Sequence, residues 1–179
     1  MLDGDTILAA LRSLSTRLGR RGVSGEINLL GGTAMVLAFQ ARQTTKDVDA
    51  IFAPTAAIRE EALAVAEELD LPRDWLNDAA KGFTSPSGGF LDLPGIELPN
   101  LRVLAPAPDY LLAMKVMAAR AAGPGGRGDK EDIRFLILRL GLSSLDQILA
   151  IVQRYYDPSR ILPRSIYIVE EILAEEGLS

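Results

Sequence analysis

Apolar residues recur along the chain with two different spacings. Between residues 5 and 22 they fall three or four positions apart, which predicts a helix that begins at an Asp5 N-cap. In residues 47–52, polar and apolar side chains alternate, the period of a half-buried strand. Similar patterns predict strands at 26–30 and 101–105, helices at 33–40, 56–70 and around Trp75, and at most short strands at 90–93 and 96–98.

From Pro108 onward the apolar spacing is helical throughout. Helices are expected at 109–122, 129–140, 144–156 and 163–176, with a Gly-Pro-Gly-Gly-Arg-Gly loop at 123–128 and a capping box formed by Ser144 and Gln147. The pattern predicts an α+β fold, with an α+β core over residues 1–107 and an all-helical part over 108–179. We expect the helical part to pack on the core as a single compact unit.

The composition excludes several classes of chemistry. The 179 residues include no histidine and no cysteine, so disulfides, thiolate nucleophiles, catalytic triads with histidine and His-ligated metals are ruled out. Any reaction must use carboxylates, hydroxyls, lysine, arginine or a hard, oxygen-bound cation. No run of 18 apolar residues and no basic, hydrophobic leader is present, so we expect a cytoplasmic protein without a membrane partner.

The net charge of −5 is unevenly distributed. Residues 45–111 carry five basic and twelve acidic side chains, whereas residues 112–169 carry nine basic and five acidic ones. The basic section offers either a local patch for phosphates or an ordinary solvated helix surface.

Two carboxylates stand two residues apart in the predicted strand 47–52. Asp47 and Asp49 would point to the same face, with Cα atoms roughly 6–7 Å apart. Such a pair suits one or two Mg²⁺ ions (or Mn²⁺), which prefer oxygen ligands and often share them with substrate phosphates. A D-x-D pair is also common in surface turns.

A Gly31-Gly32-Thr33 turn lies sixteen residues before Asp47, between a predicted strand and a predicted helix. Glycines allow a phosphate chain to approach the backbone, and the Thr33 hydroxyl could donate a hydrogen bond to it. Equally, this is an ordinary strand–helix turn with Thr33 as the N-cap.

The combination of strand, GG[ST] turn, helix, strand and D-x-D resembles the DNA polymerase β-like nucleotidyltransferase superfamily. The stretch from Arg42 to Asp49 resembles the R-x-[ST]-x-D-x-D motif of AbiEii-type nucleotidyltransferases of bacterial type IV toxin–antitoxin systems, which implies a nucleotide-binding role for Arg42 and Thr45. Residues 74–83, 101–120 and 129–137 resemble blocks of a related, largely uncharacterised family. The resemblance covers roughly residues 25 to 142 and implies a small mixed sheet of nucleotidyltransferase type.

Lys115 is the only charge in the apolar helix segment 111–119, so it either reaches the surface or enters a polar cavity. In AbiEii-type enzymes a lysine at the matching position contacts nucleotide phosphates, and Asp132 resembles an acidic residue that orients it. Asp129 fits an N-cap equally well. Many relatives in the superfamily carry a third carboxylate on a later strand; Asp92 is the best candidate for this metal ligand and Glu97 the next.

The resemblance implies a Mg²⁺-dependent nucleotidyltransferase that uses a nucleoside triphosphate (NTP). Its implied acceptor is RNA, with tRNA the leading candidate, and its implied biological role is that of a toxin with a cognate antitoxin protein. The alternative is a catalytically silent module that binds nucleotide or a protein partner, as an antitoxin-like or structural protein. Trp75 is expected in the core rather than stacked on a base, and Arg127 in a loop rather than on phosphate.

Overall fold

The computed structural model describes residues 1–119 and 126–178, together with the side chains of all of these except residues 126 and 127. Residues 123–125 of the predicted loop at 123–128, and the side chain of Arg127, therefore lie outside the described residues. Residues 126–128 begin a helix instead of completing the loop. The chain is mixed α+β and divides into two compact units. The first contains residues 1–82 and 90–106, and the second contains residues 83–89 and 107–179.

The first unit is built around a mixed sheet of five strands, in the order β5-β4-β2-β7-β6. The central strand β2 pairs antiparallel with β4 and parallel with β7. The elements are β1 (Leu2–Asp3), α1 (Gly4–Arg20), β2 (Gly25–Leu29), α2 (Gly31–Leu37), β3 (Thr44–Thr45), β4 (Val48–Ala53), α3 (Thr55–Glu68), β5 (Leu76–Asn77), η1 (Ala79–Phe83), β6 (Phe90–Asp92) and β7 (Leu101–Pro106). A two-stranded pairing of β1 with β3 completes the unit.

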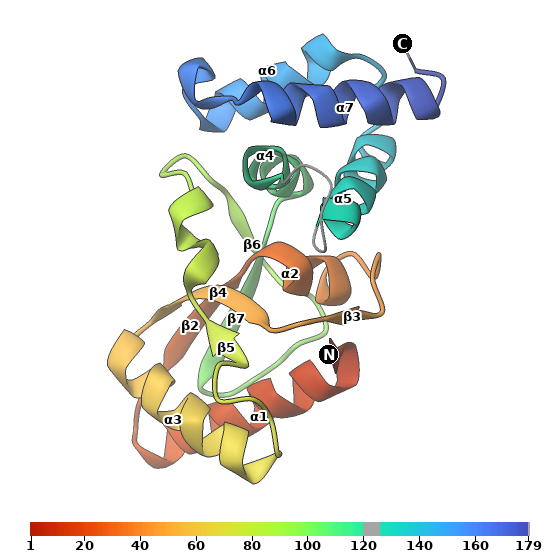
Figure 1. The fold of residues 1–179 in the computed structure, drawn as a ribbon. Coiled ribbons are helices and arrows are strands. Elements are labelled where there is room, and N and C mark those ends of the chain that lie inside the picture. The colour runs from red at the N-terminus through yellow and green to blue at the C-terminus, as the bar shows by residue number, and fades with distance from the viewer. Residues whose placement is uncertain (120–125, 179) are drawn as a thin grey trace. The chain divides into compact units, whose positions relative to one another are not determined.

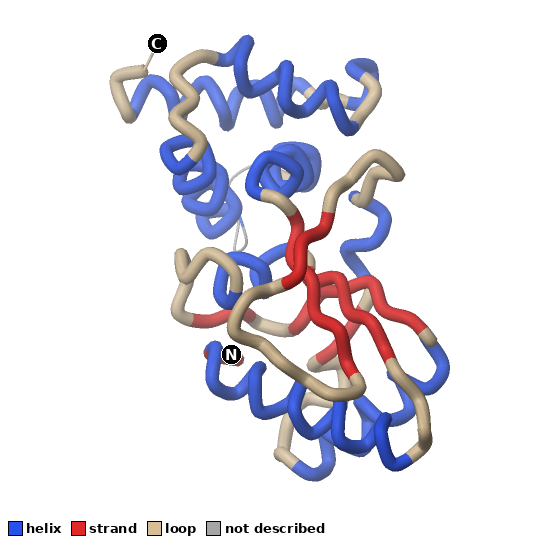
Figure 2. Tube along the Cα trace, turned by 180° about the vertical axis from the view of Figure 1, so that it is seen from behind, coloured by secondary structure: helices blue, strands red, loops and turns tan. Residues whose placement is uncertain are grey.

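One face of the sheet is apolar, and the other carries both polar and apolar side chains. Helices α1 and α3 pack against each other on the apolar side, where Ile27, Leu29 and Val103 are buried in a shared core (Figure 1). Figure 2 shows the same strands from behind. Because side chains alternate along a strand, Asn28 and Asp49 belong to the opposite face. This alternation leaves the second face available for chemistry.

Helix α1 begins two residues earlier than the sequence predicts. The N-cap is Asp3, whose carboxylate accepts a hydrogen bond from the Thr6 N–H at 2.8 Å, and Asp5 lies in the first turn instead. Both residues are types that favour a helix start, and the pairing of β1 with β3 keeps Asp3 extended. The prediction of Asp5 as the N-cap is therefore wrong; the preceding aspartate, Asp3, is the N-cap.

The segment around Trp75 is a strand followed by a 3₁₀ helix, not the predicted α-helix. The Trp75 carbonyl accepts a hydrogen bond from the Val48 N–H at 2.6 Å, and β5 continues the pairing with β4. Trp75 itself is fully buried, as predicted for a core residue, and its indole N–H donates to the Ala62 carbonyl at 2.9 Å. The predicted short strand at 90–93 is present as β6, whereas residues 96–98 form no strand.

The second unit is helical. It consists of α4 (Pro108–Ala118), α5 (Gly126–Arg139), α6 (Leu145–Tyr155), the short η2 (Pro158–Arg160) and α7 (Pro163–Glu175). Segment 83–89 belongs to this unit because tyrosines bind it: the Tyr110 hydroxyl accepts from the Ser85 N–H at 2.7 Å, and the Ser85 hydroxyl donates to the Tyr155 carbonyl at 2.6 Å. Among the described residues, no helix combines the length and apolar character needed to cross a membrane.

Candidate functional site

The two glycines before α2 lie against the residues that surround the D-x-D pair. Gly31 has a positive φ of 53°, and a Cβ at this position would lie 3.2 Å from Asp49 Oδ2. A Cβ on Gly32 would lie 2.6 Å from Thr45 Oγ1 and 3.4 Å from Arg42 Nη1. Residues ten to eighteen positions apart in the chain therefore meet. We call Gly31, Gly32, Arg42, Thr45, Asp47 and Asp49 the glycine–aspartate cluster.

Two hydrogen bonds hold the glycine turn to the D-x-D segment. The Leu30 N–H donates to the Asp49 carbonyl at 2.8 Å, and the Thr33 hydroxyl donates to the Asp47 carbonyl at 3.0 Å. Asp49 lies near the start of β4, and Asp47 directly precedes that strand. Both aspartates are half-buried. The glycine turn is thus joined to the backbone of both aspartates.

Thr33 has a structural position in this cluster. Its side chain is completely buried, and its hydroxyl is engaged with the Asp47 carbonyl, so it is not open to a phosphate in this conformation. It is not the N-cap of α2 either, because Leu30 occupies that place and provides no side-chain cap. Among the other predicted phosphate-binding residues, Gly31, Gly32 and Arg42 are half-buried. Thr45 is buried.

The chemistry of the glycine–aspartate cluster is that of an oxygen-ligand site. Asp47 and Asp49 supply two carboxylates, and the guanidinium of Arg42 lies against Gly32 beside them. This donor set fits Mg²⁺ or Mn²⁺, which bind through one or two protein carboxylates and take further ligands from water and substrate. Within residues 1–119 and 126–178, no three acidic side chains gather in a group that could hold a metal ion.

Asp92 does not join the D-x-D pair. It lies on β6, which is separated from β4 by β2 and β7, a distance of about 14 Å at the usual strand spacing. Both of its oxygens bind the Arg102 guanidinium, at 2.6 and 2.9 Å, and these hydrogen bonds lower the pKa of Asp92. The expectation of Asp92 as a shared metal ligand is therefore not met. The second candidate, Glu97, lies in the exposed segment after β6.

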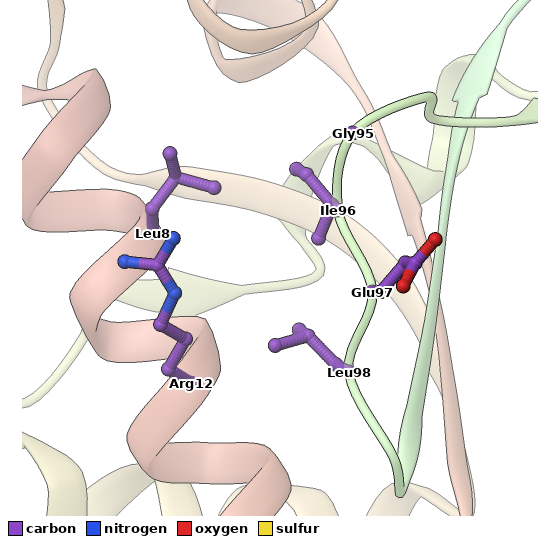
Figure 3. A pocket seen from close by; sticks show the side chains of 6 residues that line it. All are labelled: Leu8, Arg12, Gly95, Ile96, Glu97 and Leu98. Carbon is purple, nitrogen blue, oxygen red and sulfur yellow. The ribbon is translucent and has the colours of Figure 1, made fainter.

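Glu97 lines a hollow of about 310 Å³ in the first unit, between α1 and residues 95–98. Leu8 and Arg12 of α1 face Ile96 and Leu98 across it, and the Glu97 carboxylate points away from Arg12 (Figure 3). None of its six lining residues belongs to the glycine–aspartate cluster.

Lys115 lies in the helical unit and forms a buried ion pair. Its Nζ lies 2.6 Å from Asp132 Oδ2 and 3.5 Å from Asp129 Oδ1, and only 9% of the Lys115 side chain is exposed. Of the two alternatives for this lysine, the structure excludes the one in which it reaches the surface. The predicted partnership with Asp132 is present, and Asp129 adds a second, more distant carboxylate. Asp129 lies inside α5, which begins at Gly126, so it is not the N-cap.

One neighbour of the cluster was not predicted. Asn77 on β5 pairs in register with Asp49 on β4. Because directly paired residues share a face of the sheet, Asn77 and Asp49 are neighbours on the same face. The Trp-Leu-Asn-Asp segment is distinctive in sequence, but its interpretation as a helix concealed this pairing.

Comparisons with known proteins add no further evidence, since no protein-family model, curated protein or solved structure gives a significant match to this chain.

Proposed function

We propose that the chain is a Mg²⁺- or Mn²⁺-dependent nucleotidyltransferase, which moves a nucleoside monophosphate from an NTP to an acceptor. The observation that carries the proposal is the glycine–aspartate cluster, in which a glycine turn meets Arg42 and the Asp49 carboxylate and is bonded to the Asp47 carbonyl through Thr33. These groups can together hold a divalent cation and a polyphosphate. Such a site needs neither histidine nor cysteine, which fits their absence from the sequence.

Each group has a definite task in this proposal. Asp47 and Asp49 hold the cation, which would neutralise charge on the triphosphate. Gly31 and Gly32 let the backbone approach the phosphates, because neither glycine places a side chain over Asp49 or Thr45. Arg42 stabilises negative charge as pyrophosphate leaves. In the reaction, an acceptor oxygen bonds to the α-phosphorus, the bond from that phosphorus to the β-phosphate oxygen breaks, and the acceptor proton is lost to solvent.

The resemblance extends the proposal beyond the cluster. It assigns phosphate binding to Lys115, and the ion pair with Asp132 supports the orienting role of that carboxylate. On the resemblance alone we also propose RNA, with tRNA first, as the acceptor, and a cytoplasmic toxin that is neutralised by a cognate antitoxin.

A transfer assay tests the proposal directly. The protein is incubated with each labelled NTP in turn, with Mg²⁺ and total RNA, and label in the RNA is measured. We expect incorporation by the wild type and a loss of at least about a hundredfold in Asp49→Ala, the scale seen when one group that stabilises transition-state charge is removed. The matched control is Asp92→Ala, an acidic residue of the same sheet that pairs with Arg102 and should retain activity.

Equal silence of the wild type and Asp49→Ala across all NTPs and acceptors would contradict the enzyme proposal. Equal activity of the two proteins would contradict the assignment of the site.

A second candidate function is a silent nucleotidyltransferase-like module that binds a nucleotide or a protein partner. The observation that favours it is the position of Asp92, which leaves the D-x-D pair without a third carboxylate from the later strands. Calorimetry with ATP, with and without Mg²⁺, separates the two candidates. ATP binding that needs no metal and is unchanged in Asp47→Asn supports the silent module.

A further inference from the structure

Asn77 is held beside Asp49 by a short strand whose register is fixed from the core. β5 contains only Leu76 and Asn77, and two residues alone would not define a register. Trp75, directly before them, is completely buried, with its indole N–H bonded to the Ala62 carbonyl. The Val48 N–H donates to the Trp75 carbonyl at 2.6 Å. A slip of β5 would expose the indole, so the pairing of Asn77 with Asp49 is strongly specified.

The segment after Asn77 is also anchored. Asp78 pairs with Lys81 at 2.8 Å and with Arg59 of α3 at 3.0 Å, and these partners lower the pKa of Asp78. The carboxamide of Asn77 is itself oriented, because its Oδ1 accepts a hydrogen bond from the Ala79 N–H at 2.9 Å. Only the carbonyl oxygen of an amide can accept, so this bond determines which end of the group is Nδ2.

The Nδ2 group is thus a donor of fixed direction. Among the residues that the structure describes, it makes no hydrogen bond, although Asn77 is only partly exposed. A half-buried amide whose oxygen is bonded and whose N–H groups are not can donate a hydrogen bond to an oxygen atom of a ligand. The sheet register pairs Asn77 with Asp49, one of the two aspartates of the proposed metal site.

We infer that Asn77 is a substrate-binding residue of this site, and that its Nδ2 donates a hydrogen bond to a non-bridging phosphate oxygen of the nucleotide. The inference rests on the proposed function. The distances are compatible: neighbouring strands lie about 4.8 Å apart, and Mg²⁺ binds both carboxylate and phosphate oxygens at about 2.1 Å. A phosphate held through the cation at Asp49 therefore comes within reach of an amide on the adjacent strand.

Two substitutions separate the donor from the structural role of Asn77. Asn77→Asp retains the acceptor for the Ala79 N–H and the shape of the side chain, but replaces the donor with an anionic oxygen. Asn77→Ser is uncharged. Its hydroxyl oxygen can still accept the hydrogen bond from the Ala79 N–H, but the amide N–H donors are removed. We expect both variants to unfold at the wild-type temperature and to bind the Mg²⁺ complex of the preferred NTP at least about tenfold more weakly. In transfer assays the KM should rise while kcat changes less.

The probes are each of the four NTPs and inorganic tripolyphosphate, all with Mg²⁺, in isothermal titration calorimetry. Tripolyphosphate has the phosphates but neither sugar nor base, so its affinity should fall in parallel. The control is Asp92→Asn, which weakens the ion pair with Arg102 on the far side of the same sheet and should leave the dissociation constant unchanged.

Wild-type affinity in both Asn77 variants overturns the inference and leaves the proposed function intact. Weak binding by Asn77→Asp alone also overturns it, because charge repulsion would then be the cause. An effect on NTPs without one on tripolyphosphate rejects the phosphate as partner. If the wild type binds no NTP with Mg²⁺, the proposed function and the inference fail together.

Discussion

The adjacent glycines of the cluster are required for different reasons. Gly31 has a backbone conformation that other residues rarely adopt, with φ at 53°. Gly32 has no such conformation, but a Cβ there would meet the buried Thr45 hydroxyl at 2.6 Å. In one case the backbone selects glycine, and in the other the space beside Thr45 does.

We predict that Gly32→Ala destabilises the protein by about 1–3 kcal/mol, the cost of forcing an extra methyl into a packed site. Thr45 is too buried to move freely, so the helix start or β3 must shift. Chemical denaturation measures the loss in the free energy of unfolding. The control is Gly82→Ala, where a Cβ would meet nothing within 4 Å. Equal stability of the two variants would contradict the packing argument.

At the residue scale, the sequence marked Gly31, Gly32 and Asp49 as separate candidates, and only the family resemblance implied that they belong to one site; the structure places Gly31 against Asp49. The sequence did not predict that the Thr33 hydroxyl is used by the Asp47 carbonyl. The Gly-Gly-Thr sequence does not indicate whether the threonine side chain faces a ligand or the protein interior.

Among the elements, α4 and α5 are joined by the ion pair of Lys115 with Asp132. A charged pair in an otherwise apolar helix contact costs desolvation on both sides, so its partners depend on each other. Asp132 is only 2% exposed, and Lys115 Nζ lies 2.6 Å from its Oδ2.

We predict that Lys115→Met lowers the free energy of unfolding by about 3–5 kcal/mol, the usual cost of removing one partner of a buried ion pair. The double variant Lys115→Met with Asp132→Leu should recover part of that loss. A double-mutant cycle in urea measures the coupling between the two side chains. Strictly additive effects would show that the pair has no mutual stabilisation.

Sequence patterns predicted a helix or strand correctly where that element is stabilised by residues within the same segment. Ser144 is the N-cap of α6, as predicted, and accepts a hydrogen bond from the Gln147 N–H; the Gln147 side chain accepts from the Ser143 N–H rather than from Ser144. β5 is the opposite case. Its two residues become a strand only because β4 provides the partner, and no local spacing indicates that.

Across the whole molecule, the four tyrosines all lie in the helical unit, whereas the single tryptophan lies in the α+β unit. Burial, with a hydrogen bond to Asp109, raises the pKa of Tyr155 to about 12, and burial also raises the pKa of Tyr110. The two units should therefore respond differently to alkali.

We predict that the helical unit loses stability between about pH 10 and pH 12. Below pH 10, tyrosines are protonated in both the folded and the unfolded state, so their full contribution to the stability of the folded state is present. Above pH 10, the tyrosines of the unfolded chain ionise first, which favours unfolding. Circular dichroism should report helix loss before the emission wavelength of Trp75 changes. Tyr155→Phe should shift the helix transition to higher pH. Simultaneous change of both signals would contradict separate responses of the two units.

The sequence by itself determined the α+β class and the positions of most helices and strands, because these depend on periodicity. The family resemblance implied that Gly31, Gly32, Asp47 and Asp49 belong to one site. Only the tertiary structure decided which distant residues accompany the cluster. Strand order separates Asp92 from Asp49 and brings Asn77 beside it. Likewise, tyrosines of α4 and α6 assign segment 83–89 to the helical unit. Strand partners and long-range hydrogen bonds join residues whose separation in sequence has no fixed period, so no local pattern encodes them.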